Sequence, residues 1–432
     1  MTARTNAVPT SGAERGFGSN AQPASMKRGA KPSLLVVFYA NPDYFPPTRN
    51  AVSILSRYFN VTVVCRNVGQ SFARWPRDVA IERVGSGGSE DQKHRSDPID
   101  KFFEFRNFMA AVRAAVARIR PALVYAYESH AFCAALGATR GIRTAPIIFH
   151  LHELPELDAL PWHSLQTWVI RRALRKTRSA NLMVFPEKNR AEIWMRATRD
   201  GRLPLIVPNC AALGFTPDGY DVAALVERRW AGRKAFYIGA LGEQNGHGEA
   251  VQALEFLPPS VSLRMVGKGS AEYRQTLLHA AADLGAQPRL SIGEFVEHAR
   301  LKELASDATL GLALYKPTTL NWEFSSSATN KVFEYAALGL PVIAPDRPNY
   351  REFFADETWI TYANPADSRS IARAIQFVFA DRERYVQMSL AARHAFEEKF
   401  NYERVFQPAL ERVLELANVL THSVTADTSA ST

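Results

Sequence analysis

The sequence predicts an α/β fold with two Rossmann-like doubly wound domains that face each other across a cleft. Short apolar runs rich in β-branched and aromatic residues alternate with helix-like stretches through most of the chain, and such runs are typical of strands buried on both faces of a parallel sheet. The runs form two sets, separated near Pro208–Arg233 by a stretch that prolines and glycines interrupt. Repeated β-α units in two sets indicate two doubly wound sheets.

Each set gives a series of expected strands. The expected strands of the first domain are Leu34–Phe38, Val61–Cys65, Leu123–Tyr127, Ile147–Leu151, Leu182–Phe185 and Leu205–Val207. Those of the second are Ala235–Ile238, Ser262–Val266, Leu290–Ile292, Leu310–Leu314, Pro341–Ala344 and Trp359–Tyr362. Phe105–Ile119 and Ala271–Leu284 are expected to be helices. Ligands of such sheets bind outside the carboxyl ends of the strands, so the residues that follow each strand deserve most weight.

Composition narrows the class of protein. The 432 residues carry a formal net charge of +9, which favours anionic partners such as nucleotide phosphates or anionic lipid. Nothing beyond charge points to nucleic acid, so no nucleic-acid partner is expected. The three cysteines, Cys65, Cys133 and Cys210, are too scattered for a disulfide framework or a zinc site, and no metal site is expected. No signal peptide or bilayer-spanning run is apparent, so the expected location is the cytoplasm.

Glycine-rich turns follow the first two strands of the second domain. Gly239 and Gly242 belong to a loop with four glycines in ten residues, and Gly267 follows the next strand. Glycine allows a tight turn and close approach of the backbone to a ligand. A helix expected from about Glu249 would present free N–H groups to a diphosphate. The alternative is a plain turn. Lys268, beside Gly267, is expected to face solvent.

The segment from Asn330 to Ala344 carries the most specific pattern. Lys331 and Glu334 are three residues apart on one helix face, and the helix is expected to end at Gly339. A helix N-terminus with a lysine suits a diphosphate, and a carboxylate one turn later suits two ribose hydroxyls. The alternative is an ion pair between Lys331 and Glu334 within the helix.

Asn330–Ala344 resembles the signature helix and strand of GT-B glycosyltransferases in the glycosyl transferases group 1 (family 4-like) class. Weaker similarities follow in the family's order. They are Ile148–Leu154, Val207–Asn209, Tyr237–Leu241 and Leu263–Gly267. The resemblance covers about residues 33–415, and the chain is similar to bacterial exopolysaccharide enzymes of the xanthan glucuronosyltransferase type.

The resemblance implies a domain order and a reaction. Composition predicts a disordered N-terminal extension (1–32), a linker (213–232) and a disordered tail (421–432). The resemblance implies an acceptor domain (33–212), a donor domain (233–400) and a helix that crosses back to the first domain (401–420). It implies metal-independent hexosyl transfer from a nucleoside diphosphate sugar, with UDP preferred and no cofactor, in synthesis of a cell-surface polysaccharide. By the same resemblance Glu334 contacts the donor ribose, and Asn330 and Lys331 lie beside the diphosphate.

The sequence departs from the family pattern at the sugar pocket. The acid expected eight residues before Glu334 is replaced by Ser326, and Glu323 is a candidate to take its place. The family's Gly-Gly turn after the first strand is replaced by Asn41–Pro47. These departures leave the stereochemical outcome, retaining or inverting, open. They also keep two alternatives in view: a GT-B nucleotide-sugar epimerase and a non-catalytic GT-B binding module.

A His-Glu pair stands at the expected carboxyl end of a strand in the first domain. An inverting transfer needs a general base near the acceptor hydroxyl, and Glu153 is the first candidate, with His152 as its partner or as a contact to the donor sugar. Glu128 and His130 are the second candidates. In a retaining route the leaving phosphate can take the proton, and the pair would only position substrates.

Two stretches combine aromatic and basic residues. The first contains Trp162, Trp168, Arg171, Arg172 and Arg175. The second contains Lys101, Phe102, Phe103, Phe105, Arg106 and Phe108. Tryptophan beside arginine suits an anionic bilayer surface, which predicts peripheral attachment to the inner face of the plasma membrane and a lipid-linked acceptor. The alternative is a pair of amphipathic helices packed on the sheet.

Overall fold

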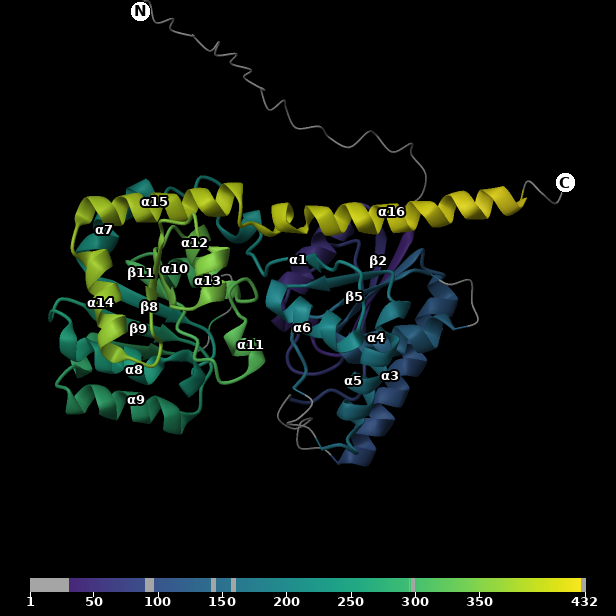
Figure 1. Cartoon of the computed structure of the whole chain (residues 1–432), viewed down its shortest axis with the longest axis horizontal. Coiled ribbons are helices and arrows are strands. Elements are labelled where there is room, and N and C mark those ends of the chain that lie inside the picture. Colours follow the sequence, from purple (N-terminus) through teal and green to yellow (C-terminus); the bar gives the residue numbers. More distant parts are fainter. Residues whose placement is uncertain are drawn as a thin grey trace, which may run out of the picture. The chain divides into compact units, whose positions relative to one another are not determined.

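The computed structural model describes residues 31–89, 97–140, 145–156, 161–294, 296 and 300–428, and it describes 301, 302 and 419–428 by their backbone alone. The expected disordered extension therefore lies almost wholly outside the described residues. Within Pro32–Thr432, which forms one compact unit, the strands form two parallel sheets (Figure 1). The α/β class and the two doubly wound sheets are confirmed.

The first sheet has the strand order β3-β2-β1-β4-β5-β6-β7. Its strands are β1 (Ser33–Phe38), β2 (Asn60–Arg66), β3 (Ala80–Val84), β4 (Leu123–Tyr127), β5 (Ile147–His150), β6 (Leu182–Phe185) and β7 (Leu205–Ile206). The sequence did not predict β3. This edge strand is only partly buried along its length, so it lacks the continuous apolar character of its neighbours.

The second sheet has the strand order β10-β9-β8-β11-β12-β13. Its strands are β8 (Lys234–Ile238), β9 (Ser262–Val266), β10 (Leu290–Gly293), β11 (Leu310–Leu312), β12 (Val342–Pro345) and β13 (Ile360–Ala363). Each corresponds to an expected strand, with ends that differ by a residue or two.

Helices connect successive strands of both sheets. Those before β8 are α1 (Pro46–Leu55), α3 (Pro98–Ile119), α4 (Glu128–Thr139), α5 (Leu165–Lys176), α6 (Lys188–Thr198) and α7 (Ala223–Gly232). Those after it are α8 (His247–Gln252), α9 (Ala271–Asp283), α10 (Leu301–Leu304), α11 (Leu320–Glu323), α12 (Asn330–Ala337), α13 (Pro348–Phe353), α14 (Ser368–Phe379), α15 (Arg382–Glu398) and α16 (Tyr402–Thr428). Short 3-10 turns are η1 (Pro42–Tyr44), η3 (Thr177–Ser179), η4 (Leu213–Phe215), η5 (Glu243–Asn245), η6 (Ala253–Phe256) and η7 (Gln287–Arg289).

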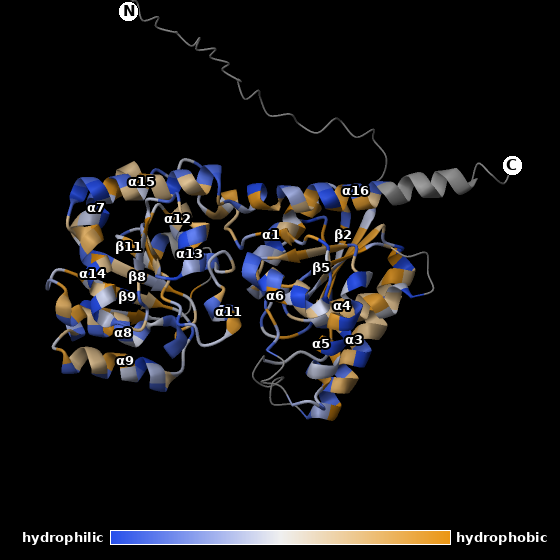
Figure 2. Ribbon diagram, viewed as in Figure 1, coloured by the Kyte–Doolittle hydropathy of each residue, from blue (hydrophilic) through white to orange (hydrophobic). Residues whose placement is uncertain are grey.

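Strand β1 shows why the first sheet is covered on both faces. Leu34, Val36 and Phe38 belong to a core shared with α1 and α16, whereas Leu35 and Val37 belong to a core shared with α3, α4, α5 and α6. Side chains alternate between faces along a strand, so a fully apolar strand needs a helical layer on each side. Figure 2 shows the strands mainly in the hydrophobic colours, while the helices carry both colours.

Helix α16 follows α15 of the second half and packs on α1 and β4 of the first sheet (Figure 1). The Tyr402 amide donates to the Ala211 carbonyl at 2.8 Å, and Tyr402 and Phe406 are buried in the core shared with α1. The helix continues to Thr428, into the segment 421–432 for which the sequence predicts a disordered tail. The residues from 429 onward lie outside the described part of the chain.

In both sheets the strand order reverses at the centre. The strand order changes sense between β1 and β4 in the first sheet and between β8 and β11 in the second. A doubly wound sheet leaves a crevice at this point, outside the carboxyl ends of the strands. The segments that follow β1, β4, β8 and β11 are therefore the segments to examine for a site.

Candidate active site

A cavity of about 730 Å³ lies at the carboxyl ends of the strands of both sheets. It contains most of the site residues expected from the sequence. Those that line it are His152, Glu153, Gly239, Gly267, Asn330, Lys331 and Glu334. Further lining comes from Asp43–Pro47, Arg49, Phe72, Glu156, Arg190, Asn209, Tyr315, Asn321, Ser325 and Thr329.

Gly239 and Gly267 allow three chain segments to meet at the cavity wall. Both have positive φ, and a Cβ on Gly267 would overlap the Gly239 carbonyl oxygen. A Cβ on Gly239 would come within 2.5 Å of Cε of Lys331. The two turns are therefore packed on each other and on Lys331, which explains glycine at both positions on packing grounds alone.

The Lys331 ammonium is held between two aromatic rings. Its Nζ lies 5.3 Å from the ring centroids of both Tyr237 and Tyr315. An ammonium near ring faces is stabilised by the ring quadrupole and still keeps donors for an anion.

Helix α12 begins at the cavity without a side-chain cap. Several other helices are capped, as α9 is by the Ser270 hydroxyl, but no side chain caps α12 at Thr329. The Thr329 hydroxyl instead hydrogen-bonds to the Tyr315 hydroxyl. The amide oxygen Oδ1 of Asn330 is buried without a hydrogen-bond partner. The N–H groups of this first turn are thus available to an anion.

The rest of the first glycine loop lies elsewhere. Among the described lining residues of this cavity, only Gly239 comes from the segment Gly239–Gln252. Gly242 donates its N–H to Nδ1 of His247 at 3.3 Å, and α8 begins at His247 rather than near Glu249. The structure therefore does not support the expectation that this helix presents its N-terminus to a diphosphate, and Gly242 is better explained by the local turn.

His152 is buried beside the cavity, with 5 % of its surface exposed. Its Nε2 hydrogen-bonds to the Thr48 hydroxyl at 3.3 Å, and its ring stacks on Tyr127 with centroids 5.3 Å apart. Burial, with a smaller effect of Arg190, lowers the pKa of His152 to about 3. The imidazole is therefore neutral at physiological pH and positions its neighbours instead of carrying charge.

Glu153 projects from the same strand end and is exposed to the cavity. Its neighbour Glu128 accepts the His152 amide hydrogen at 2.8 Å. Burial, reinforced by the charge of Glu153, raises the pKa of Glu128 to about 8. Glu128 therefore keeps its proton near neutral pH, and Glu153 is the solvent-exposed carboxyl of the two.

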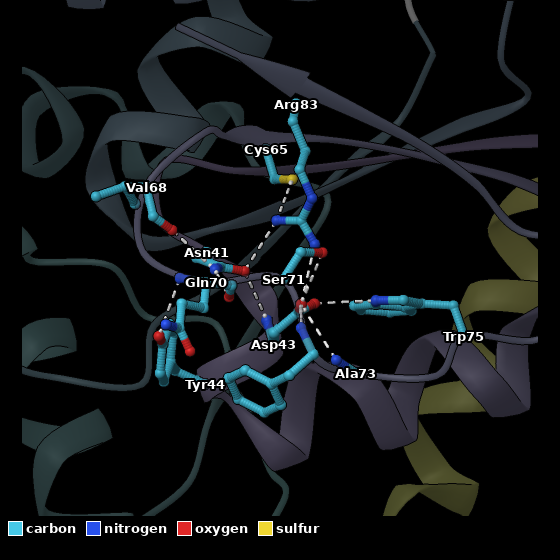
Figure 3. A network of polar contacts seen from close by, with 11 residues as sticks. Asn41, Asp43, Tyr44, Cys65, Val68, Gln70, Ser71, Ala73, Trp75 and Arg83 are labelled. Atoms are coloured by element: carbon cyan, nitrogen blue, oxygen red, sulfur yellow. Dashed lines mark hydrogen bonds and ion pairs between the residues drawn. The ribbon is translucent and has the colours of Figure 1, made fainter. Parts of the chain in front are cut away.

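The segment Asn41–Pro47, which replaces a glycine turn, is tied down by a polar network (Figure 3). The Asp43 carboxylate accepts from the Trp75 indole, the Phe72 amide and the Arg83 guanidinium, each at 3.0 Å. Burial alone would raise the pKa of Asp43, but these hydrogen bonds outweigh it and the pKa is lowered. Asp43 thereby fixes η1 and the 71–75 loop as one wall of the cavity.

Two cavity arginines were not predicted from the sequence. Arg49, on α1, has a buried Nε without a hydrogen-bond partner. Burial lowers its pKa, and the charges of Asp43 and Glu334 offset part of this effect. Arg190, on α6, is 6 % exposed and donates to three backbone carbonyls. Neither belongs to a recognisable motif, because each reaches the cavity from a helix rather than from a strand end.

The substitutions at the expected sugar pocket have structural outcomes. Ser326 is buried, with 1 % of its surface exposed, and it is absent from the described lining of the cavity. Glu323 is exposed and is also absent from that lining, so its proposed sugar contact gains no support. His130 and Glu128 line a second cavity of about 420 Å³, which shares Glu153 and Asn321 with the first.

The aromatic-basic stretches divide between core and surface. Phe105 and Phe108 are buried against the first sheet, so they cannot belong to a surface patch. Trp162, Trp168, Ile99, Phe102 and Phe103 are exposed, and Arg171 and Arg175 are exposed on α5. Among the described residues, no helix has the length and apolar character needed to cross a membrane.

Comparison with known proteins gives a family-model match to part of the chain and several solved structures with a similar fold. Residues 249–411 match the family model described as glycosyl transferase-like. The solved structures that are similar include HepE of Anabaena in complex with UDP, with a TM-score of 0.65 at 16% identity over 89% of this chain and 100% of that chain. No curated protein gave a significant match.

Two further solved structures share the fold. Sucrose-phosphate synthase from Thermosynechococcus elongatus has a TM-score of 0.67 at 16% identity, over 89% of this chain and 100% of that one. WaaG, a glycosyltransferase involved in lipopolysaccharide biosynthesis, has a TM-score of 0.59 at 13% identity, over 87% and 98%. The chain therefore has the GT-B fold, and its second half is glycosyl transferase-like.

Proposed function

We propose that this protein transfers a sugar from a nucleoside diphosphate sugar, preferably a UDP sugar, to a saccharide acceptor. One observation carries the proposal. A single cavity brings the uncapped start of α12, with Lys331 and Glu334, together with the strand end that holds Glu153. Glycosyl transfer requires an anion site for the leaving diphosphate, and its inverting form also requires a base such as a carboxylate. The glycosyl transferase-like second half and the UDP complex of the similar HepE structure support the donor class.

The donor half provides for the leaving group. As the bond from the anomeric carbon to the diphosphate breaks, negative charge grows on the phosphate oxygens. The first-turn N–H groups of α12 and the Lys331 ammonium are placed to stabilise that charge. The buried carboxylate of Glu334 would accept hydrogen bonds from the ribose hydroxyls, as acidic residues do in dinucleotide folds.

Glu153 would activate the acceptor. In an inverting transfer the acceptor hydroxyl attacks the anomeric carbon, and its proton passes to the Glu153 carboxylate. Neutral His152, hydrogen-bonded to Thr48, would orient the strand end without exchanging a proton itself. In a retaining transfer the leaving phosphate takes the proton, and Glu153 only positions the acceptor. The anomeric configuration of the product distinguishes the two.

Nucleotide binding is the first test. A thermal-shift series with UDP, GDP, ADP and CMP should raise the melting temperature most with UDP, because a ligand that binds only the folded state stabilises it. No shift with any nucleotide would contradict the proposal and favour a non-catalytic module. Conversion of the donor sugar to its epimer without an acceptor would instead identify an epimerase. Activity unchanged by EDTA would support metal independence.

We further propose that the acceptor is lipid-linked and belongs to cell-surface polysaccharide synthesis at the inner face of the plasma membrane. The outward side of α5 supports this, because the Arg172 guanidinium lies 5.6 Å from the ring of exposed Trp168 and the neighbouring arginines are exposed. Such a surface suits anionic headgroups. Flotation with anionic liposomes should recover the protein at low salt, and Arg171→Glu with Arg175→Glu should reduce recovery. No recovery of the wild type at low salt would exclude the membrane surface.

A further inference from the structure

The backbone on both sides of Glu153 is held by side chains. The His152 amide donates to the Glu128 carboxylate at 2.8 Å, and the His152 carbonyl accepts from Nη1 of Arg190 at 2.6 Å. The Leu154 amide donates to Oδ1 of Asn321, and the Leu154 carbonyl accepts from Nδ2 of Asn321, both at 2.8 Å. Four backbone groups beside Glu153 are therefore fixed.

Two of these four hydrogen bonds are made by a residue from the half of the chain that forms the second sheet. Asn321 is part of α11, which follows β11 of the second sheet. Arg190 lies on α6 of the first half, but its Nη2 donates to the Asn321 carbonyl at 2.5 Å and its Nε to the Phe324 carbonyl at 2.7 Å. One buried guanidinium thus binds carbonyls on both sides of the cavity.

The same segment of the second half is bonded to the first half at two more points. The Ser327 hydroxyl donates to the Pro186 carbonyl at 2.7 Å. Asn209 donates its backbone N–H to the Ser327 carbonyl at 2.8 Å and its side-chain amide to the Ala328 carbonyl at 2.7 Å. We call the segment 321–328 the latch.

The latch also lies at the junction of the two cavities. Asn321 and Glu153 line both the cavity that contains Lys331 and Glu334 and the smaller cavity that contains Glu128 and His130. The latch leads directly into Thr329 and α12, the helix assigned to the diphosphate. The latch therefore connects α12, along the chain, to the two hydrogen bonds that Asn321 makes with Leu154 beside Glu153.

We infer that Asn321 and Arg190 are positioning residues that couple nucleotide binding at α12 to the placement of Glu153. The inference rests on the proposed function, because it assigns the nucleotide to α12. Movement of the latch away from β5 would break both hydrogen bonds between Asn321 and Leu154, and the strand end would lose two of its restraints. A nucleotide bound at α12 would hold the latch against the strand end, so Glu153 is fixed more firmly when a donor is present.

Hydrogen exchange of the full-length protein tests this coupling, with UDP as the probe. The amides of His152 and Leu154 lie in a peptide covering 150–156, and their exchange reports local opening. UDP should slow exchange of this peptide in the wild type. In Asn321→Ala, loss of the Leu154 pairing should speed exchange without nucleotide about tenfold and remove the slowing by UDP. Because coupling is reciprocal, UDP affinity should fall by no more than the factor by which UDP slows this exchange in the wild type.

Asn349→Ala is the matched control. Its side-chain amide donates to the Glu323 carbonyl of the latch at 3.2 Å, a bond that stays within the second half. This variant should therefore behave as the wild type. Asn321→Asp keeps an acceptor for the Leu154 amide and should retain part of the protection, which gives a second reading if Asn321→Ala has a lowered melting temperature.

Each outcome bears on the coupling. Equal UDP-dependent slowing in the wild type and in Asn321→Ala would overturn it, even if the apo rates differ. If no variant binds UDP, the proposed donor fails, and the latch is then judged by apo exchange alone. Equal apo exchange of the 150–156 peptide in the wild type, Asn321→Ala and Asn349→Ala would overturn it as well.

Discussion

At the residue scale, Gly239, Gly267 and Lys331 of the cavity are held in place by neighbouring protein atoms. Gly267 has no room for a side chain because the Gly239 carbonyl occupies that position, and Gly239 has none because Lys331 does. The lysine in turn lies between Tyr237 and Tyr315. A lysine confined in this way loses little further freedom when it binds a phosphate, which makes it an effective anion contact.

Replacement of Lys331 should therefore weaken nucleotide binding. A hydrogen bond to a charged group contributes about 1.5–3 kcal/mol, so Lys331→Ala is expected to raise the Kd for UDP roughly ten- to hundredfold. Glu334→Ala should also weaken binding through the ribose. Isothermal titration with UDP measures both. Lys268→Ala is the control, because Lys268 is an exposed lysine of the same half outside the described cavity lining. Unchanged affinity in Lys331→Ala and Glu334→Ala would show that α12 is only a scaffold.

Replacement of Glu153 should instead lower turnover and leave nucleotide binding nearly unchanged. If its carboxylate accepts the acceptor proton, Glu153→Gln should lower kcat by roughly 10²–10⁴ and leave the Kd for UDP nearly unchanged, because general base catalysis contributes about that factor. Glu192→Gln, an exposed change on α6, serves as control. A kcat for Glu153→Gln within a few fold of the wild type would indicate the retaining route, in which the leaving phosphate takes the proton.

Among the elements, η1 and the loop after β2 are joined by the Asp43 network. Asn41 extends it, with its side-chain amide on the Val68 and Gln70 carbonyls and its oxygen accepting from Arg83. The network fixes the segment Asn41–Pro47 (Figure 3). Tyr44 of the same segment lies 5.8 Å from the Lys268 ammonium of the other half. One buried carboxylate therefore shapes a whole wall of the cavity.

Loss of that carboxylate should be costly. The Asp43 side chain is fully buried and paired with Arg83 at 3.0 Å. Removal of one partner from a buried pair typically costs about 3–5 kcal/mol, so Asp43→Ala should lower the free energy of unfolding by about that amount. Urea denaturation measures it. The control is Asp346→Ala, whose pair with Arg351 is largely exposed and should cost at most about 1 kcal/mol. Equal losses in the two variants would show that the network is not structural.

At the scale of the whole molecule, several histidines are buried in the neutral form. Burial is the main cause in each case, and it lowers the pKa of His130 to about 4 and of His152 and His247 to about 3. The unfolded chain protonates these groups near pH 6.5. Below that pH the unfolded state binds more protons than the folded state, so stability falls as the pH falls from 6.5 toward 4.

Glu128 acts in the other direction. Its pKa is raised from 4.5 to about 8, mainly by burial, so the folded state retains a proton that the unfolded state loses between these values. Stability then falls as the pH rises through that window. We expect the free energy of unfolding to be greatest near pH 6.5, with a steep loss toward pH 4 and a smaller loss toward pH 8. Urea denaturation across this range measures both limbs. Glu128→Gln should flatten only the upper limb, and an unchanged upper limb would contradict the assignment.

The sequence by itself determined the two sheets, the β-α order and the segment from Asn330 to Pro341. Strands buried on both faces are continuously apolar, and that character is local in the chain. Among the described strands, this apolar pattern missed only β3, an edge strand that is partly exposed and therefore not continuously apolar. It also identified the strand end at Glu153, because the carboxyl ends of parallel strands meet at one edge.

Only the tertiary structure decided which polar groups meet. Arg190 donates a hydrogen bond to the backbone carbonyl of Asn321, which is 131 residues away in the sequence. The Asp43 network likewise joins residues of η1, β3 and a loop. The structure also shows that Phe105 and Phe108 lie in the core and not in a surface patch, and that Gly242 is absent from the described cavity lining. Hydrogen bonds and burial depend on distances between segments remote in sequence, and no local pattern of residue types records them.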